Sequence, residues 1–126
     1  MRLLALVMLG GALGAGLRHL VGAWMLRQFA SGWPLGTLAV NLAGAFLAGL
    51  AFAWLEAKGP AAAPWRAFLV VGVLGGMTTF SALMLECLVF ARSDRPGMVA
   101  AYLAASLAGG LVLVWLGAWA GRQFSG

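Results

Sequence analysis

Four long apolar runs separated by short polar turns constrain this 126-residue chain more than any other feature of its sequence. A helix that crosses the hydrocarbon core of a membrane needs about 20 apolar residues. The predicted spans have about this length and cover residues 3–26, 36–55, 66–91 and 98–120. A linker over residues 56–64 contains Pro60 and Pro64, which break helices. The sequence therefore predicts an all-α integral membrane protein, with four transmembrane helices in a single domain over residues 1–126.

The composition agrees with lipid as the main surroundings of the chain. Hydrophobic residues make up 63% of the sequence and charged residues only 9%, far from the values of soluble domains. The eight Lys and Arg residues lie mostly at the ends of the runs, where lipid headgroups favour them. A nucleic-acid-binding surface needs clustered basic residues. We expect a multi-pass protein of the cell (inner) membrane that binds no nucleic acid.

The positive charges are nearly balanced between the two sides of the membrane. Four spans place both termini on one side, together with Arg2, Lys58, Arg66 and Arg122, whereas Arg27, Arg92 and Arg95 lie on the other. Membrane helices are oriented by an asymmetry of Lys and Arg near their ends. Because this asymmetry is so small, we expect dual topology, in which the chain pairs with an inverted copy of itself as an antiparallel homodimer.

Small residues predict close contacts between helices. Three GxxxG pairs occur, Gly10 with Gly14, Gly72 with Gly76, and Gly117 with Gly121. Such pairs let helix backbones approach closely in lipid. They pack either the helices of one subunit or the contact between two subunits, and the sequence leaves both interpretations open.

The third run contains glycines followed by hydroxyl residues at mid-membrane depth, in the segment 72–81. Helix propensity is poor there. One interpretation is a break in the helix, whose free carbonyls would suit a hard cation such as Na⁺. The alternative is a close helix crossing at the glycines, with the threonine hydroxyls bonded back to their own helix.

Polar side chains also lie inside the second and fourth runs. Thr37 and Asn41 are four residues apart on one helix face, and Tyr102 and Ser106 repeat this spacing. Each side chain either bonds to a neighbouring helix or lines a polar path. These neutral donors suit a small anion, and the electropositive edge of the Phe80 ring is a further candidate contact.

Two charged residues lie inside the runs, Arg18 in the first and Glu86 in the third. Buried charges are costly in lipid and are usually paired or functional. Either the two residues pair, or Arg18 attracts anions at a vestibule and Glu86 joins a structural hydrogen-bond network. An enzyme is not expected, because the only histidine, His19, adjoins Arg18 and the only aspartate, Asp94, lies in a turn.

The motifs in all four runs together resemble those of the CrcB/Fluc fluoride channel family. The matching segments are 10–15 leading to Arg18, 36–44 with Phe46, 75–81 with Glu86, and Tyr102 with Ser106. The run Gly-Gly-Met-Thr-Thr-Phe-Ser at residues 75–81 and the run Gly-Thr-Leu-Ala-Val-Asn at residues 36–41 are the specific ones. The resemblance extends over nearly the whole chain.

This resemblance implies a channel for passive fluoride efflux, built as an antiparallel homodimer with two pores. It also implies a break in the third helix, with a central structural Na⁺ bound by the backbone carbonyls of Gly75 and Thr78 at that break. Arg18 would lie at a vestibule, and Glu86 there or in a structural network. The implied pore residues are Thr37, Asn41, Phe80, Ser81, Tyr102 and Ser106.

One departure from the family pattern concerns residues 82 and 83. The family continues with Thr and Phe after the Phe-Ser pair, whereas Ala82 and Leu83 stand here. We therefore expect slower conduction and no fluoride contact at Leu83. The main alternative function is a small dual-topology multidrug transporter, but the first run lacks the carboxylate that such transporters use. A membrane anchor is a third interpretation, and it would need no aligned donors on three helices.

Overall fold

The computed structural model describes residues 1–124, and four helical spans long and apolar enough to cross a membrane occur within this part of the chain. Three of them are continuous helices: α1 (Arg2–Gln28), α2 (Leu35–Glu56) and α6 (Pro96–Gln123). Their ends lie within three residues of the predicted ones. The prediction of an all-α fold with four spans is confirmed.

The third span begins earlier than predicted and consists of several pieces between Gly59 and Arg92. These pieces are η1 (Gly59–Ala62), α3 (Ala63–Trp65), η2 (Arg66–Leu74), α4 (Gly75–Met77) and α5 (Phe80–Arg92). The predicted linker over residues 56–64 was wrong, because most of it is helical. Pro60 and Pro64 lie in the first turns of η1 and α3, where a missing N–H removes no helical hydrogen bond.

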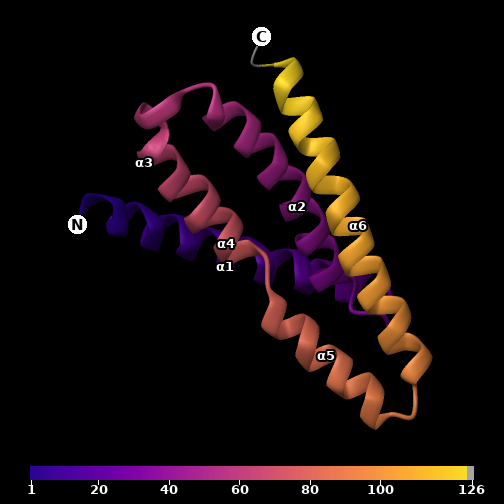
Figure 1. Ribbon diagram of the computed structural model, residues 1–126. Coiled ribbons are helices and arrows are strands. Elements are labelled where there is room, and N and C mark those ends of the chain that lie inside the picture. Colours follow the sequence, from indigo (N-terminus) through magenta and orange to yellow (C-terminus); the bar gives the residue numbers. More distant parts are fainter. Residues whose placement is uncertain (125–126) are drawn as a thin grey trace.

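The helix break predicted for the third span is confirmed at Thr78 and Thr79. Both residues have extended backbones, with φ and ψ of −79° and 155° at Thr78 and −153° and 120° at Thr79. Figure 1 shows the break as a thin connection between α4 and α5. Residues of η2 before the break form a wide π-helix, in which N–H groups bond five residues back.

The GxxxG pairs pack helices of the same chain. A Cβ on Gly10 would lie 2.9 Å from the Cα of Gly72, and one on Gly76 would lie 2.5 Å from the carbonyl oxygen of Gly11. Helix α1 therefore crosses η2 and α4 at backbone contact. Gly117 packs in the same way, because its Cβ would lie 2.0 Å from the carbonyl oxygen of Phe46 on α2. Of the two open interpretations, packing within one subunit is the one observed.

The helix after the break packs less tightly than the rest. Helices α2 and α6 run side by side, whereas α5 continues beyond the break and contacts mainly α6 (Figure 1). Several large apolar side chains of α5 are exposed, namely Phe80, Met84, Leu85, Leu88 and Val89. The chain therefore has an open side along its third span.

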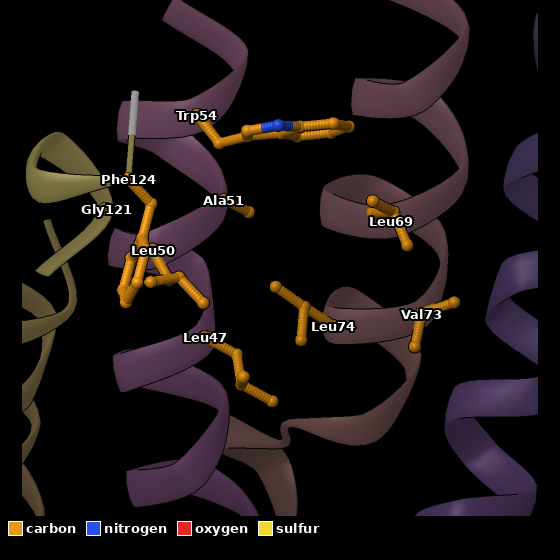
Figure 2. A pocket seen from close by; sticks show the side chains of 9 residues that line it. All are labelled: Leu47, Leu50, Ala51, Trp54, Leu69, Val73, Leu74, Gly121 and Phe124. Carbon is orange, nitrogen blue, oxygen red and sulfur yellow. The ribbon is translucent and has the colours of Figure 1, made fainter. Parts of the chain in front are cut away.

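An apolar hollow of about 460 Å³ lies on the other side of the break, between α2 and η2. Its lining includes Leu47, Leu50, Leu69 and Leu74, and the ring of Trp54 extends across one end (Figure 2). The Lys58 ammonium group lies over that ring, 4.6 Å from its centroid. Both a broad apolar hollow and an exposed apolar helix thus flank the break.

Candidate functional site: a polar groove at the helix break

A groove of about 430 Å³ lies at the break and brings together residues of α2, the third span and α6. Five of its lining residues were predicted from sequence as pore or cation ligands: Asn41, Gly75, Thr78, Phe80 and Ser106. The other predicted residues, Thr37, Ser81 and Tyr102, lie outside the lining of this groove. The groove is therefore the candidate site.

Asn41 uses both the nitrogen and the oxygen of its side-chain amide to hold the extended backbone at the helix break. Its Nδ2 donates to the carbonyl oxygen of Thr79 at 3.0 Å, and its Oδ1 accepts from the N–H of Thr79 at 2.7 Å. In a continuous helix, that N–H would donate to the carbonyl of Gly75 four residues earlier. Asn41 thus replaces a helical hydrogen bond and fixes the break, which is the interhelical role that the sequence left open.

The two threonines of the break act locally. The Thr78 hydroxyl donates to the carbonyl of Leu74, one turn back in its own helix, at 2.8 Å. The Thr79 hydroxyl accepts from the N–H of Ala82 at 3.2 Å and caps α5. The break and the back-bonded threonine, which were alternative interpretations of the sequence, therefore occur together.

Phe80 is the first residue of α5, and 70% of its surface is exposed at the rim of the groove. Its neighbour Ser81 is also exposed, and the Ser81 hydroxyl lies 3.3 Å from that of Thr79. An aromatic ring exposed at mid-span has little to pack against within its own subunit. Phe80 is therefore free to contact either an ion in the groove or a second subunit.

Ser106 provides the clearest vacant hydrogen-bonding group in the groove. Its Oγ is buried and has no hydrogen-bond partner among residues 1–124. A buried polar atom without a partner is rare and costs free energy, since it has lost its hydrogen bonds to water. The groove therefore contains a hydroxyl that can donate to a small anion without first breaking a protein hydrogen bond.

Glu86, Thr37 and Tyr102 form a separate hydrogen-bonded cluster, here called the Glu86 cluster. The Thr37 hydroxyl donates to Oε1 of Glu86, and the Tyr102 hydroxyl donates to Oε2, each at 2.6 Å. Tyr102 is completely buried, with 0% of its surface exposed. Glu86 is therefore part of a structural network, and no ion pair joins it to Arg18 in the described part of the chain.

Two predicted residues remain without an observed role. Arg18 is half-buried on α1. Gly75 lines the groove, and its carbonyl does not receive the Thr79 N–H that a regular helix would supply, because that N–H donates to Asn41. Backbone oxygens released by a broken helix are the type of ligand that binds Na⁺ in membrane proteins. The local chemistry of the break therefore fits the predicted cation.

The sequence analysis did not predict that Leu83 lines the groove. This side chain lines the groove and is 4% exposed, because it packs with Cys87, Phe90 and Tyr102 in a buried cluster. The helical spacing could have indicated this position, because Leu83 lies three residues after Phe80 and three before Glu86, hence on the same side of α5. The departure from the family pattern thus falls between the groove and the Glu86 cluster.

The fold and groove define a small four-span membrane protein with a broken third span and a polar groove at the break. A family model described as "CrcB-like protein, Camphor Resistance (CrcB)" matches residues 5–118. The chain belongs to this family, as its motifs predicted.

Named relatives cover nearly the whole chain. A protein of Xanthomonas euvesicatoria pv. vesicatoria is 56% identical over 119 residues, which are 94% of this chain and 90% of the relative. One from Xylella fastidiosa is 56% identical over 91% of this chain and 80% of its own length, and one from Hyphomonas neptunium is 44% identical over 94% of each. All three are named fluoride-specific ion channel FluC. The family is one of ion channels, not of enzymes, and the transporter alternative receives no support.

Proposed function

We propose that this protein is a fluoride-specific channel that lets fluoride leave the cell passively through the groove at the helix break. The observation that supports the proposal most strongly is the buried Ser106 hydroxyl without a partner, in the same groove as the exposed ring of Phe80. Fluoride is small and strongly hydrated, so a pore must replace its water with converging donors. A vacant hydroxyl and an electropositive ring edge meet this need.

The proposed assembly is an antiparallel homodimer. Within one subunit, α5 exposes an apolar side that includes Phe80, Met84 and Leu88, while the hollow between α2 and η2 exposes apolar walls. In an antiparallel dimer, a two-fold axis near the break would place the partner's third span in the opposite direction and bring each α5 to the partner's hollow. Such a self-complementary contact is what a two-fold dimer requires. The near balance of positive charge between the two sides permits both orientations.

The proposed dimer binds one structural Na⁺ at its centre. The carbonyls of Gly75 and Thr78 in each subunit would hold the ion where the two breaks meet. When bound, Na⁺ would offset the partial negative charge of these carbonyls and fix the two subunits together. The two hydrogen bonds between Asn41 and Thr79 support this role, because they hold the break open from the α2 side. We propose that the dimer lies in the cell membrane.

Fluoride efflux from liposomes tests the proposed activity. Purified protein is reconstituted into liposomes loaded with potassium fluoride, valinomycin is added, and external fluoride is followed with an electrode. Chloride-loaded liposomes are measured in parallel. We expect rapid fluoride release with negligible chloride release. No fluoride release from a correctly folded protein would contradict the proposal.

Two variants of α5 connect the activity with the groove. Phe80→Ala removes the exposed ring at the groove and should slow fluoride release at least about tenfold, the effect of 1.4 kcal/mol. Leu85→Ala is the matched control, because Leu85 is a large apolar residue of the same helix with a similar exposure of 62% and does not line the groove. Equal release from both variants would show that the Phe80 ring is not part of the path.

A further inference from the structure

The outward side of α6 carries an apolar groove of about 520 Å³, here called the outer groove. All residues that line it belong to α6, namely Leu111, Val112, Trp115, Leu116, Trp119 and Arg122. Each of them is exposed, and Trp115 has 70% of its surface exposed. Because all but the arginine are apolar, this surface needs a covering of lipid or of another protein.

The outer groove faces away from the rest of the subunit, and Figure 1 shows α6 at one edge of it. Gly117 of α6 is buried at backbone contact with Phe46 of α2. Trp115 and Trp119 are each two residues from Gly117, hence on nearly the opposite side of the helix. Ser106 lies about three full turns before Gly117, so the groove at the break is on the Gly117 side. The proposed dimer contact, which uses that groove, α5 and the hollow, therefore leaves the outer groove open.

The length of the outer groove matches the depth of one leaflet of the bilayer. Arg122 lies in the last turn of α6, at the end of the span. Leu111 lies about three turns deeper, which is about 16 Å along a helix that rises 1.5 Å per residue. The hydrocarbon core is about 30 Å thick, so one leaflet contributes about 15 Å. An acyl chain laid along the groove would therefore extend from the level of Arg122 to the middle of the bilayer.

The end of the outer groove at Arg122 suits an anionic headgroup. The guanidinium group of Arg122 makes no hydrogen bond or ion pair with residues 1–124, and α6 contains no Asp or Glu. Trp119 lies three residues deeper, and its indole N–H has no partner within the same range. A guanidinium group binds phosphate oxygens through paired N–H donors, and tryptophan rings are favoured at the headgroup level. Two free donors therefore lie where a lipid headgroup would be.

We propose that the outer groove binds one anionic phospholipid, with its phosphate on Arg122 and one acyl chain along Trp115 and Leu116. The Trp119 indole donates to an ester carbonyl, which lies just below the phosphate. An anionic headgroup is favoured over a zwitterionic one, because the positive charge of Arg122 has no acidic partner on α6 and a zwitterionic lipid adds a second cation beside it. The inference does not depend on fluoride conduction, since the outer groove and the groove at the break lie on opposite sides of α6.

Native mass spectrometry of the protein in detergent tests the site by counting the lipids that stay bound. Phosphatidylglycerol and phosphatidylcholine with the same chains are added in parallel samples. We expect the unmodified protein to retain phosphatidylglycerol about fivefold better, the contribution of one basic residue at a membrane surface. Arg122→Gln should lose this preference and Arg122→Lys should keep most of it. Arg27→Gln is the matched control, because Arg27 is exposed in the last turn of α1 and does not line the outer groove.

The apolar wall is tested in the same way. Trp115→Ala should lower the retention of both lipids, because it removes the largest exposed side chain along the acyl chain. Trp24→Ala is the matched control, since Trp24 is 50% exposed at the end of α1 and does not line the outer groove. Size-exclusion profiles establish that all variants fold.

Three outcomes would overturn the inference. Equal retention of the two lipids by the unmodified protein would show that the groove does not select a negative headgroup. An equal loss in Arg27→Gln and Arg122→Gln would show that basic residues at the span ends bind lipid without a defined site. An assembly of more than two chains that disappears in Trp115→Ala would show that the outer groove is covered by another copy of the chain and not by lipid.

Discussion

Asn41 is predicted to stabilise the fold as well as to line the groove. Replacing it by Ala removes two hydrogen bonds, of 3.0 and 2.7 Å, and leaves the N–H and the carbonyl of Thr79 without these partners. Thr79 is 9% exposed, so water does not readily replace them. Hydrogen bonds between membrane helices average about 0.6 kcal/mol and reach about 1.7 kcal/mol. Two of them give a loss of about 1–3 kcal/mol in the free energy of unfolding.

The assay is equilibrium unfolding in mixed micelles, followed by the fluorescence of the six tryptophans. Protein and detergent concentrations are kept equal between variants, because the stability of an oligomer depends on concentration. Thr78→Val is the matched control. Its hydroxyl bonds only to a carbonyl of its own helix, so its loss should cost about 0.5 kcal/mol or less, in the range of local helix contacts.

Fluoride efflux is measured on the same preparations. We expect the loss of flux in Asn41→Ala to accompany a shift in the unfolding midpoint, and Asn41→Asp to be still less stable, because a carboxylate would face the Thr79 carbonyl. If Asn41→Ala unfolds at the same midpoint as the unmodified protein and yet loses flux, the amide acts on the ion alone and the structural reasoning is wrong.

Three further predictions follow from the packing and the site. Leu83→Phe should still conduct fluoride in the liposome assay; complete loss of flux would show that the assignment of the pore lining is wrong. Gly14→Ala places a Cβ 2.1 Å from the carbonyl oxygen of Val73 and should lower the unfolding midpoint, whereas Gly16→Ala should not; equal midpoints would contradict a backbone contact between α1 and η2. Replacing Na⁺ by N-methyl-D-glucamine should shift the protein from dimer to monomer in detergent, as measured by light scattering; no shift would count against the structural cation.

The spans could be predicted from sequence because their length and apolar character are set by the thickness of the bilayer. The glycines and hydroxyl residues at 72–81 left the break as one of two interpretations, because they favour helix poorly, and the family resemblance implied it. The helical start of the third span could not be predicted. Pro60 and Pro64 predict a linker, and only their positions within the first turn of each short helix make them compatible with helix.

The partners of the polar residues were harder to predict than their depth. The i, i+4 spacing placed Asn41 on one face with Thr37, yet Asn41 bonds to the break and Thr37 bonds to Glu86. The choice depends on how α5 leaves the break, and this direction follows from tertiary packing. For the same reason, sequence alone left open whether Glu86 pairs with Arg18 or with hydroxyls.

The two polar regions of the subunit differ in how they could interact with an anion. The Ser106 hydroxyl is buried and unpartnered, so an ion there gains a hydrogen bond without displacing another. The hydroxyls of Thr37 and Tyr102 are held by the Glu86 carboxylate, so an ion must compete with a full negative charge. A small anion with concentrated charge competes best, because hydrogen-bond strength rises as charges come closer. The expected pore lining includes both Thr37 and Ser106, so we predict that Thr37→Val, unlike Ser106→Ala, mainly alters the ratio of fluoride to chloride release.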